Sequence, residues 1–496
     1  MNSPQYDAIV IGSGAGGAAA AYRLALGGLQ VVLLEKGDHL PTDGSTLDIT
    51  RVVRDGAFLS REAWVDGRGR RLTPEERFNV GGKTKWYGAA LLRMAEREFL
   101  PDTTYQCLGW PLTAGELVPY YEEAERLLEV RIFDCEPDLA RLLDRLEARD
   151  PRWRASAMPM SLAAEILADR TEAAHFDGFS SARNLKGEAE RSILSLLRSR
   201  ENFSLRVNAP VRSLVGSADS PAAISGVRLG DGSEVRARCV VLAAGALHSP
   251  RLLSRYLAAT GLAQSLPAAS QVGRYLKLHL LTAMVALSPS PKTDLLRKTV
   301  LLTNDRFPHS SVQPLGFDGE LIGTLVPKFI PGPLRKAIGQ RAYGFFLQTE
   351  DGSDVRNRVI EDATGPRPPV LDYDVDRLPA AAREHRAFTH AFQGALARTG
   401  FVSFTRRISL SGTAHACGSL ICGASPADSV VDANGRVHGM HGIYVADGSV
   451  LPRSSRVNPS LTIYAWGLRV GDLIARQLAR SSQPQRSPTP GTTHAA

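Results

Sequence analysis

The sequence predicts an α/β fold with one parallel, helix-covered sheet and a second, mostly antiparallel sheet. Three observations support this expectation: a strand, glycine turn, helix and strand at the N-terminus, a strand-rich middle broken by prolines, and short apolar strands near the C-terminus. At 496 residues the chain is too long for one compact core, so we expect two domains.

The first elements follow an order that is typical of a dinucleotide site. Residues 6–11 form a short apolar run, residues 12–17 read Gly-Ser-Gly-Ala-Gly-Gly, and an alanine-rich segment continues to about residue 26. A second apolar run at 30–34 ends in Glu35. Short apolar runs bounded by glycine indicate buried parallel strands. We therefore expect a Rossmann-type βαβ unit here.

The glycine spacing has a physical reason. Gly12 permits the tight turn, Gly14 lets the backbone approach a pyrophosphate, and Gly17 lets the helix pack close to the sheet. The free N–H groups of the helix then face the anion. Glu35 can accept hydrogen bonds from an adenosine ribose and disfavours a 2′-phosphate, so NADP is a poor candidate. The motif alone does not separate FAD from NAD.

The dinucleotide domain is expected to be discontinuous, spanning residues 1–275 and 406–480. Strand signals at 203–207, 211–215, 224–229 and 234–242 include an Asp-Gly hairpin turn at 231–232. They predict a three-stranded antiparallel insertion that leads back into a buried strand, which ends at Ala244 and Gly245 near the cofactor.

Residues 276–405 are expected to form most of an α+β substrate-binding domain on a mostly antiparallel sheet. Strand-like runs lie at 299–303 and 322–329, an extended run follows at 368–373, and helical periodicity covers about 380–397. Residues 481–496 are rich in Ser, Pro, Thr and Gln, which predicts a disordered tail.

Composition excludes several classes of protein. The net charge of +8 is spread along the chain, so a nucleic-acid surface is not expected. No apolar run approaches the roughly 20 residues of a membrane span, and the first strand leaves no room for a signal segment, so we expect a cytoplasmic protein. The five cysteines lack the spacing of a metal site and suit packing as reduced thiols, so we expect no metal.

A C-terminal block places polar side chains among glycines and short apolar runs. Residues 415–419 read His-Ala-Cys-Gly-Ser, residues 444–449 read Tyr-Val-Ala-Asp-Gly-Ser, and residues 457–460 read Val-Asn-Pro-Ser. A chain positions two polar groups against a rigid ligand in this way. The block therefore predicts one wall of a binding site.

The chain resembles the glucose–methanol–choline (GMC) family of FAD-dependent oxidoreductases over nearly its whole length. Beside the glycine turn and the C-terminal block, the resemblance rests on four segments: Val-Gly-Gly-Lys-Thr-Lys-Trp-Tyr-Gly at 80–88, Gly-Trp-Pro at 109–111, Ala-Gly-Ala at 244–246 and Val-Gly-Arg at 272–274. These segments occur in the family's order. The resemblance implies that the dinucleotide is FAD.

The resemblance also implies the site residues. His415 matches the histidine of the family's His-x-x-Gly-Thr/Ser pattern, and Asn458 matches its second active-site position. An alcohol gives up a hydride only when its hydroxyl proton is removed, which suits a histidine base; asparagine can hold the alcohol without adding charge. The expected cofactor-binding residues are Gly12, Ser13, Gly14, Ala15, Gly17, Glu35, Lys36, Gly81, Gly82, Thr84, Tyr87, Val211, Ala244, Gly245, Asp447, Gly448, Asn458, Pro459 and Ser460.

Two departures from the family pattern matter. Trp86 stands where some relatives carry a histidine linked covalently to FAD, so we expect noncovalent FAD. Tyr87 stands where many carry asparagine, and it can place a hydroxyl or a ring against the flavin. His279 lies near a histidine of the relatives, where it either borders the site or is a satisfied core histidine.

The predicted function is oxidation of a CH–OH group of a small-molecule alcohol, with a sugar, amino sugar or polyol as the first expectation and an apolar or aromatic alcohol as the alternative. The electron acceptor is oxygen, a quinone or a redox protein, and the sequence does not decide among them. A redox-neutral flavoprotein of the same fold, a lyase or photodecarboxylase, is the rival hypothesis. The presence of both His415 and Asn458 argues against it.

Overall fold

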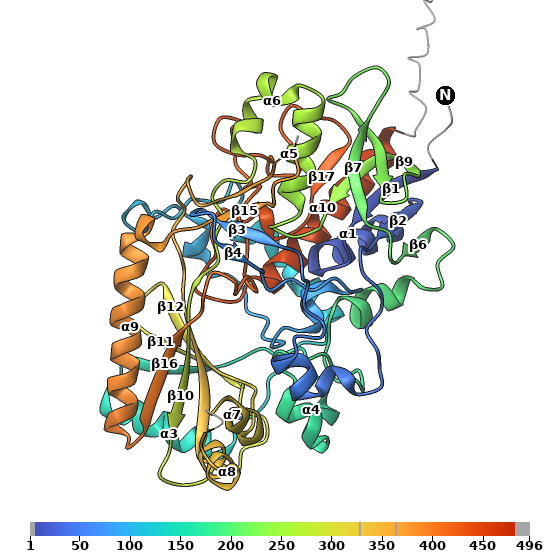
Figure 1. The fold of residues 1–496 in the computed structure, drawn as a ribbon. Coiled ribbons are helices and arrows are strands. Elements are labelled where there is room, and N and C mark those ends of the chain that lie inside the picture. The colour runs from blue at the N-terminus through green and yellow to red at the C-terminus, as the bar shows by residue number, and fades with distance from the viewer. Residues whose placement is uncertain (1–4, 327–328, 363–364, 482–496) are drawn as a thin grey trace, which may run out of the picture.

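The computed structural model describes residues 5–326, 329–362 and 365–481 (Figure 1). It is a mixed α/β structure with two large sheets, as the sequence predicts, and a small third sheet. Residues 482–496, nearly all of the expected disordered tail, lie outside the described residues. Within the described ranges, no helix combines the length and hydropathy that a membrane span requires.

The first large sheet has the strand order β6-β2-β1-β9-β8-β7, with β17 also paired to β9. The pairings among β6, β2, β1, β9 and β17 are parallel, whereas β7, β8 and β9 pair in antiparallel fashion. The strands are β1 (Tyr6–Ile11), β2 (Val31–Leu34), β6 (Phe203–Arg206), β7 (Val211–Gly216), β8 (Ile224–Leu229), β9 (Glu234–Leu242) and β17 (Ile443–Val445).

The register of this sheet places the site. Ile11 pairs with both Leu34 and Leu242, and Val445 also pairs with Leu242, so β1, β2, β9 and β17 end at one level. The residues that follow these strands therefore converge at one edge. Ligands of open parallel sheets bind at the carboxyl ends of the strands.

Two helices pack tightly beside this sheet. Helix α1 (Ala15–Leu26) lies against α10 (Ser460–Ser481), which closes the fold (Figure 1). Small residues bring their backbones together: a Cβ at Gly467 would lie 2.4 Å from the Gly16 carbonyl oxygen, and one at Gly471 would lie 2.6 Å from that of Ala20. Because α1 is covered on several sides, its alanine-rich sequence is almost entirely buried.

The second large sheet is antiparallel throughout and has the order β16-β10-β13-β12-β11-β5. Helix α9 lies beside it (Figure 1), and Phe388 and Phe392 of that helix pack in its core. The elements are β5 (Trp153–Ala157), β10 (Leu280–Leu287), β11 (Val300–Asn304), β12 (Ser310–Pro314), β13 (Ala342–Thr349), α9 (Pro379–Arg398) and β16 (Val402–Arg407).

The remaining elements lie between and around the two sheets. The small sheet has the order β14-β15-β3-β4. These elements are β3 (Trp64–Asp66), β4 (Arg71–Leu72), α2 (Ala114–Leu127), α3 (Pro137–Arg149), α4 (Arg170–His175), α5 (Ser249–Ala259), α6 (Leu262–Ser265), α7 (Gly319–Leu325), α8 (Gly332–Gln340), β14 (Arg358–Ile360) and β15 (Val370–Asp372).

One expected strand is wrong. The apolar run at 322–329 was expected to be strand-like, but residues Gly319–Leu325 form helix α7. Asp318 caps this helix, because its side chain accepts hydrogen bonds from the backbone N–H groups of Glu320 and Leu321. The cap lies outside the apolar run, so the periodicity of the run alone did not reveal the helix.

Candidate active site

A cavity of about 650 Å³ lies at the carboxyl ends of β1, β2, β9 and β17. Gly12, Glu35, Ala243 and Asp447, which follow these strands closely, all line it. Residues of the second sheet, among them Leu281 and Phe346, line it as well. The cavity therefore spans from the parallel sheet to the antiparallel one.

The glycine turn has the geometry that its sequence predicts. Gly12 has φ +101°, and a Cβ there would lie 2.4 Å from the Ala243 carbonyl oxygen. Gly14 has φ −67°, and a Cβ there would meet no heavy atom of the described chain within 4 Å. No side chain caps α1, so its first N–H groups have no side-chain acceptor. The start of the helix, at Gly14 and Ala15, lines the cavity, which these groups face. This is an open, electropositive place for an anion.

Two of the expected cofactor-binding residues do not line the cavity. A Cβ at Gly17 would lie 2.0 Å from the Gly12 carbonyl oxygen, so Gly17 serves the close packing of α1. Gly81, with φ +83°, donates its N–H to Ser13 Oγ at 3.0 Å. The other expected residues all line the cavity: Gly12, Ser13, Gly14, Ala15, Glu35, Lys36, Gly82, Thr84, Tyr87, Val211, Ala244, Gly245, Asp447, Gly448, Asn458, Pro459 and Ser460.

Glu35 is tied to the glycine turn. Its Oε2 accepts hydrogen bonds from the backbone N–H of Ser13 at 3.1 Å and from Ser13 Oγ at 2.6 Å, and its Oε1 accepts one from the Gly37 N–H at 2.9 Å. A carboxylate has about four lone-pair sites, so Glu35 keeps acceptor capacity for a ribose hydroxyl. The contacts fix the carboxylate at the end of β2.

Asp447 joins two turns at the sheet edge. Its Oδ2 accepts hydrogen bonds from the Gly245 N–H at 2.8 Å and from Ser249 Oγ, and its Oδ1 accepts one from the Ser449 N–H at 2.9 Å. Burial raises the pKa of Asp447, although these donors oppose the shift. The turn after β9 and the turn after β17 are thereby held together beside the cavity.

His415 and Asn458 meet at the cavity. His415 Nε2 lies 3.5 Å from Asn458 Nδ2, and both residues line the cavity. Gln313 Nε2 of β12 donates a hydrogen bond to Asn458 Oδ1. The pKa of His415 is well below its usual value because the ring is buried and because further basic side chains, among them Lys298 and Lys83, lie nearby.

Tyr87 presents its ring to the cavity and uses its hydroxyl elsewhere. The hydroxyl donates a hydrogen bond to the Gly187 carbonyl oxygen at 2.7 Å. Burial raises the pKa of this hydroxyl above its usual value. Of the two roles expected for Tyr87, a ring contact therefore fits the structure better than a hydroxyl contact.

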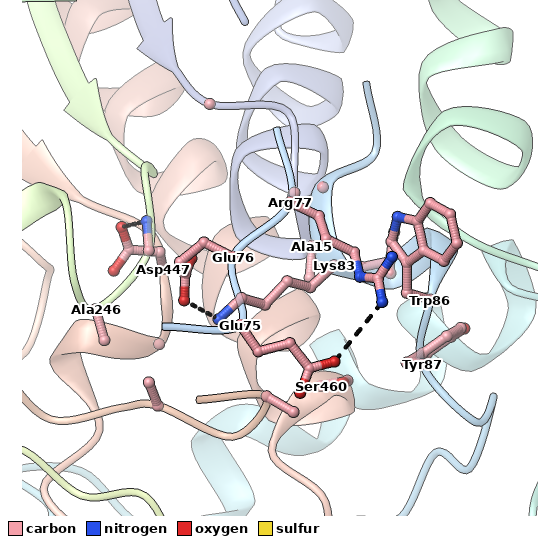
Figure 2. Close-up of a pocket in the computed structure, with 18 of the residues that line it drawn as sticks. Ala15, Glu75, Glu76, Arg77, Lys83, Trp86, Tyr87, Ala246, Asp447 and Ser460 are labelled. Atoms are coloured by element: carbon pink, nitrogen blue, oxygen red, sulfur yellow. Dashed lines mark hydrogen bonds and ion pairs between the residues drawn. The ribbon is translucent and has the colours of Figure 1, made fainter. Parts of the chain in front are cut away.

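The sequence did not reveal several charged residues of the cavity. Glu75 pairs with Arg77, and Glu76 pairs with Lys83, whose Nζ lies 2.5 Å from the carboxylate (Figure 2). Figure 2 also shows Arg77 beside Trp86, and the guanidinium lies 4.0 Å from the indole centroid. Asp177 and Lys298 form a third pair at 2.8 Å, and Glu62 and Arg251 form a fourth at 2.9 Å. Apart from Lys83, which belongs to the 80–88 segment, these residues form no sequence motif, so no signal marks them.

The residues that line the cavity fit FAD. The open space at Gly14 and the free N–H groups of α1 suit a pyrophosphate, and Glu35 suits a ribose. Helix α10 begins at Ser460, so its first N–H groups also point toward the cavity. There they would stabilise negative charge on a flavin ring.

Comparisons with known proteins agree with this reading. The family described as FAD dependent oxidoreductase matches residues 7–403, and the family described as GMC oxidoreductase matches residues 362–467. The chain is a GMC-type FAD-dependent oxidoreductase. The expectations of an FAD enzyme of this family and of its fold are thus confirmed.

Individual relatives align with almost the whole chain. Paromamine 6′-oxidase of Streptomyces fradiae is 28% identical, with 96% of this chain and 93% of the relative aligned. 6‴-Hydroxyparomomycin C oxidase of Streptomyces lividus is 29% identical, with 96% and 92% aligned. A crystal structure of pyridoxine 4-oxidase from Mesorbium loti has a TM-score of 0.57 and 20% identity, and covers 96% of this chain and 99% of that one.

FAD is bound noncovalently, and residue 86 forms no bond to it. Trp86 lines the cavity, and its indole Nε1 donates a hydrogen bond to Asn79 Oδ1 at 3.0 Å. An indole offers no nitrogen lone pair for a bond to the flavin. The ring therefore contributes packing and a contact with Arg77 instead.

Acid precipitation tests this attachment directly. We expect all of the yellow colour to leave with the supernatant when the purified protein is precipitated with acid, because only noncovalent contacts hold the cofactor. The absorbance of supernatant and redissolved pellet gives the partition. Colour that stays in the pellet after washing would show a covalent bond at some other residue.

Proposed function

We propose that this GMC-type enzyme oxidises a CH–OH group of an alcohol to a ketone or aldehyde, with His415 taking the hydroxyl proton. The observation that carries the proposal is the pairing of an acceptor and a donor beside the cavity. His415 Nε2 and Asn458 Nδ2 lie 3.5 Å apart, so a single hydroxyl oxygen can lie within hydrogen-bond distance of both atoms.

Each group has a defined task in this proposal. His415 Nε2 accepts the O–H proton, and the Asn458 Nδ2–H donates to a lone pair of the same oxygen. Gln313 holds the Asn458 amide in the required orientation, because it donates to Oδ1 and so leaves Nδ2 facing His415. Bound FAD supplies the acceptor for the hydride that leaves carbon.

We assign the cofactor and the substrate to different parts of the chain. Residues 1–275 and 406–480 would hold FAD through the glycine turn, Glu35, Asp447 and the start of α10. Residues 276–405 would form the main part of the substrate domain. Strand β5 and the end of β16 beyond residue 405 belong to the same antiparallel sheet and would be part of this domain too. The expected catalytic pair would then lie where the two meet.

A polyhydroxylated substrate, a sugar, amino sugar or polyol, is the class that we favour. Several of the carboxylates that line the cavity are paired with cations, among them Glu75–Arg77, Glu76–Lys83 and Asp177–Lys298. Such pairs supply donors and acceptors without a large net charge, which suits hydroxyl groups. By their names, the two relatives with 28% and 29% identity act on amino-sugar compounds, which supports the same class.

An apolar or aromatic alcohol remains the second candidate because part of the lining is apolar. Phe346 approaches His415 edge to face with the ring centroids 6.2 Å apart. Further apolar contacts come from Leu281, Leu315, Phe317 and Ile408. A redox-neutral lyase or photodecarboxylase is less well supported, because neither reaction needs the alcohol-binding pair.

A substrate panel tests the proposed function. Purified, FAD-loaded protein is mixed without oxygen with amino sugars, their 6-deoxy counterparts, polyols and aromatic alcohols, and the visible absorbance of oxidised flavin is followed. We expect bleaching by a polyhydroxylated alcohol and none by the matched compound that lacks its reacting hydroxyl. Failure across the panel would favour a redox-neutral reaction. Admitting air afterwards distinguishes an oxidase, which recolours at once, from a dehydrogenase that needs a quinone or redox protein.

The pH dependence of flavin reduction follows from the environment of His415. Burial and the nearby cations Lys298 and Lys83 lower its pKa, so the neutral, proton-accepting ring persists below pH 6.5. We expect the rate constant for reduction to stay level between about pH 7.5 and 5.5, whereas an imidazole with a pKa of about 6.5 would lose about tenfold there. Rapid mixing in buffers across this range measures it. A midpoint near 6.5, with FAD still bound, would contradict this expectation.

A further inference from the structure

His279 lies directly behind His415 and contacts it. The two Nδ1 atoms are 3.1 Å apart, and the rings are nearly perpendicular, at 81°. His279 is only 5% exposed and has φ +63°, a left-handed conformation that is uncommon outside glycine. Such a conformation persists only where the surroundings hold it.

The other ring nitrogen of His279 has a fixed protonation. Its Nε2 lies 3.1 Å from the Ser454 carbonyl oxygen and 2.8 Å from that of Ser455. Carbonyl oxygens only accept hydrogen bonds, so Nε2 must carry a hydrogen. In a neutral ring, His279 Nδ1 is then bare, and it can only accept.

The loop that presents these carbonyls is itself firmly held. Arg453 donates to both carboxylate oxygens of Glu350, at 2.8 and 2.7 Å, and Ser454 Oγ donates to Asp351 Oδ1 at 2.7 Å. Ser455 has φ +69° and donates its N–H to Glu350. Buried, charge-assisted hydrogen bonds of this kind fix geometry strongly.

We infer that His279 is a positioning residue that sets the tautomer of His415, keeping its proton on Nδ1 and its lone pair on Nε2. Because His279 Nδ1 accepts, His415 Nδ1 must donate, and the neutral His415 ring then has a bare Nε2. This nitrogen is the one that faces Asn458. The inference rests on the proposed role of His415 as the base.

The donor and acceptor roles set by His279 extend through His415 to Asn458 and Gln313. A bare His415 Nε2 requires the Asn458 amide to present Nδ2–H to it, so Asn458 Oδ1 must accept, as it does from Gln313. The carbonyls of Ser454 and Ser455 thus determine which atoms donate and which accept in four successive side chains, those of His279, His415, Asn458 and Gln313. When His415 Nε2 takes the alcohol proton, His279 accepts from an imidazolium, and this hydrogen bond strengthens.

Histidine-labelled ¹⁵N NMR of the FAD-loaded protein tests the tautomer without any reaction. The His415 signals are assigned by their loss in a His415→Asn variant. We expect the parent protein to show His415 protonated at Nδ1 and bare at Nε2. A proton on Nε2 in the parent would overturn the inference, even if His415 proved to be the base.

Two variants at His279 test the consequence for the reaction. We expect His279→Leu to slow flavin reduction about 10- to 100-fold, the range found when the partner that orients a metal-bound histidine is lost, with the apparent KM unchanged because the contact strengthens only during proton transfer. His279→Asn keeps an acceptor and tolerates a positive φ, so it should recover most of the rate. His385→Leu is the matched control: His385 is 4% exposed, lies between two threonine hydroxyls and does not line the cavity.

The outcomes separate the inference from the proposed function. Parent-like reduction by His279→Leu, or equal losses in His279→Leu and His279→Asn, would overturn the positioning role. If instead no alcohol reduces the flavin, or His415→Asn reduces it normally, the proposed base fails while the NMR result still reports the tautomer.

Discussion

Replacing His415 by asparagine is expected to slow reduction of the flavin by an alcohol about 10²- to 10⁴-fold, the usual range for loss of a general base. Asparagine is polar and of similar shape but has no basic nitrogen. His415 contacts His279 and Asn458 and none of the expected pyrophosphate or ribose groups, so the FAD content should not change. Rapid mixing without oxygen measures the rate, and the visible spectrum measures bound FAD.

The same substitution elsewhere provides the control. His385→Asn replaces a buried histidine of helix α9, whose ring bridges Thr282 and Thr349 of the antiparallel sheet. We expect it to lower the free energy of unfolding while the rate constant for flavin reduction stays near that of the parent. If His415→Asn reduced the flavin as fast as His385→Asn does, the proposed base would be rejected.

Gly14→Ala is expected to weaken FAD binding by at least about tenfold, or about 1.4 kcal/mol. Its Cβ would enter open space at the start of α1, where a pyrophosphate must approach the backbone. The backbone angles of Gly14, φ −67° and ψ −170°, suit alanine, so the cofactor-free protein should be no less stable. Titration of the cofactor-free variant with FAD gives the affinity, and thermal unfolding gives the stability.

Gly115→Ala is a control for this substitution. Gly115 lies in the first turn of α2, away from the cavity, and a Cβ there would be 3.8 Å from Thr113 Oγ, an ordinary contact. We expect it to leave FAD affinity unchanged and to raise stability slightly, because alanine favours helix. Unchanged FAD affinity in Gly14→Ala would show that the pyrophosphate lies elsewhere.

Most residues on the FAD side of the cavity could be predicted from the sequence because short local motifs mark them. The glycine turn, the acid that ends β2 and the turn at Asp447 each follow a buried strand, and parallel strands bring their carboxyl ends to one edge. Gly17 and Gly81 were the exceptions. Gly17 serves the close packing of α1 that its place in the glycine turn predicts, and Gly81 has a left-handed conformation, φ +83°, that favours glycine.

The substrate side could not be predicted to the same depth because its residues come from distant strands. Gln313 reaches Asn458 only because of the register between β12 and β13. The pairs Glu75–Arg77 and Asp177–Lys298 lie in segments without a regular pattern. For His279 the sequence left a site role and a core role open, and the structure shows a buried ring that also contacts His415.

A single turnover without oxygen tests the central claim most directly. FAD-loaded protein is mixed with an excess of an alcohol that bleaches it, and the flavin absorbance and the product are measured on the same sample. We expect one carbonyl product for each flavin reduced, and an unbleached flavin in His415→Asn on the same timescale. Bleaching without a carbonyl product, or equally fast bleaching in the variant, would contradict it.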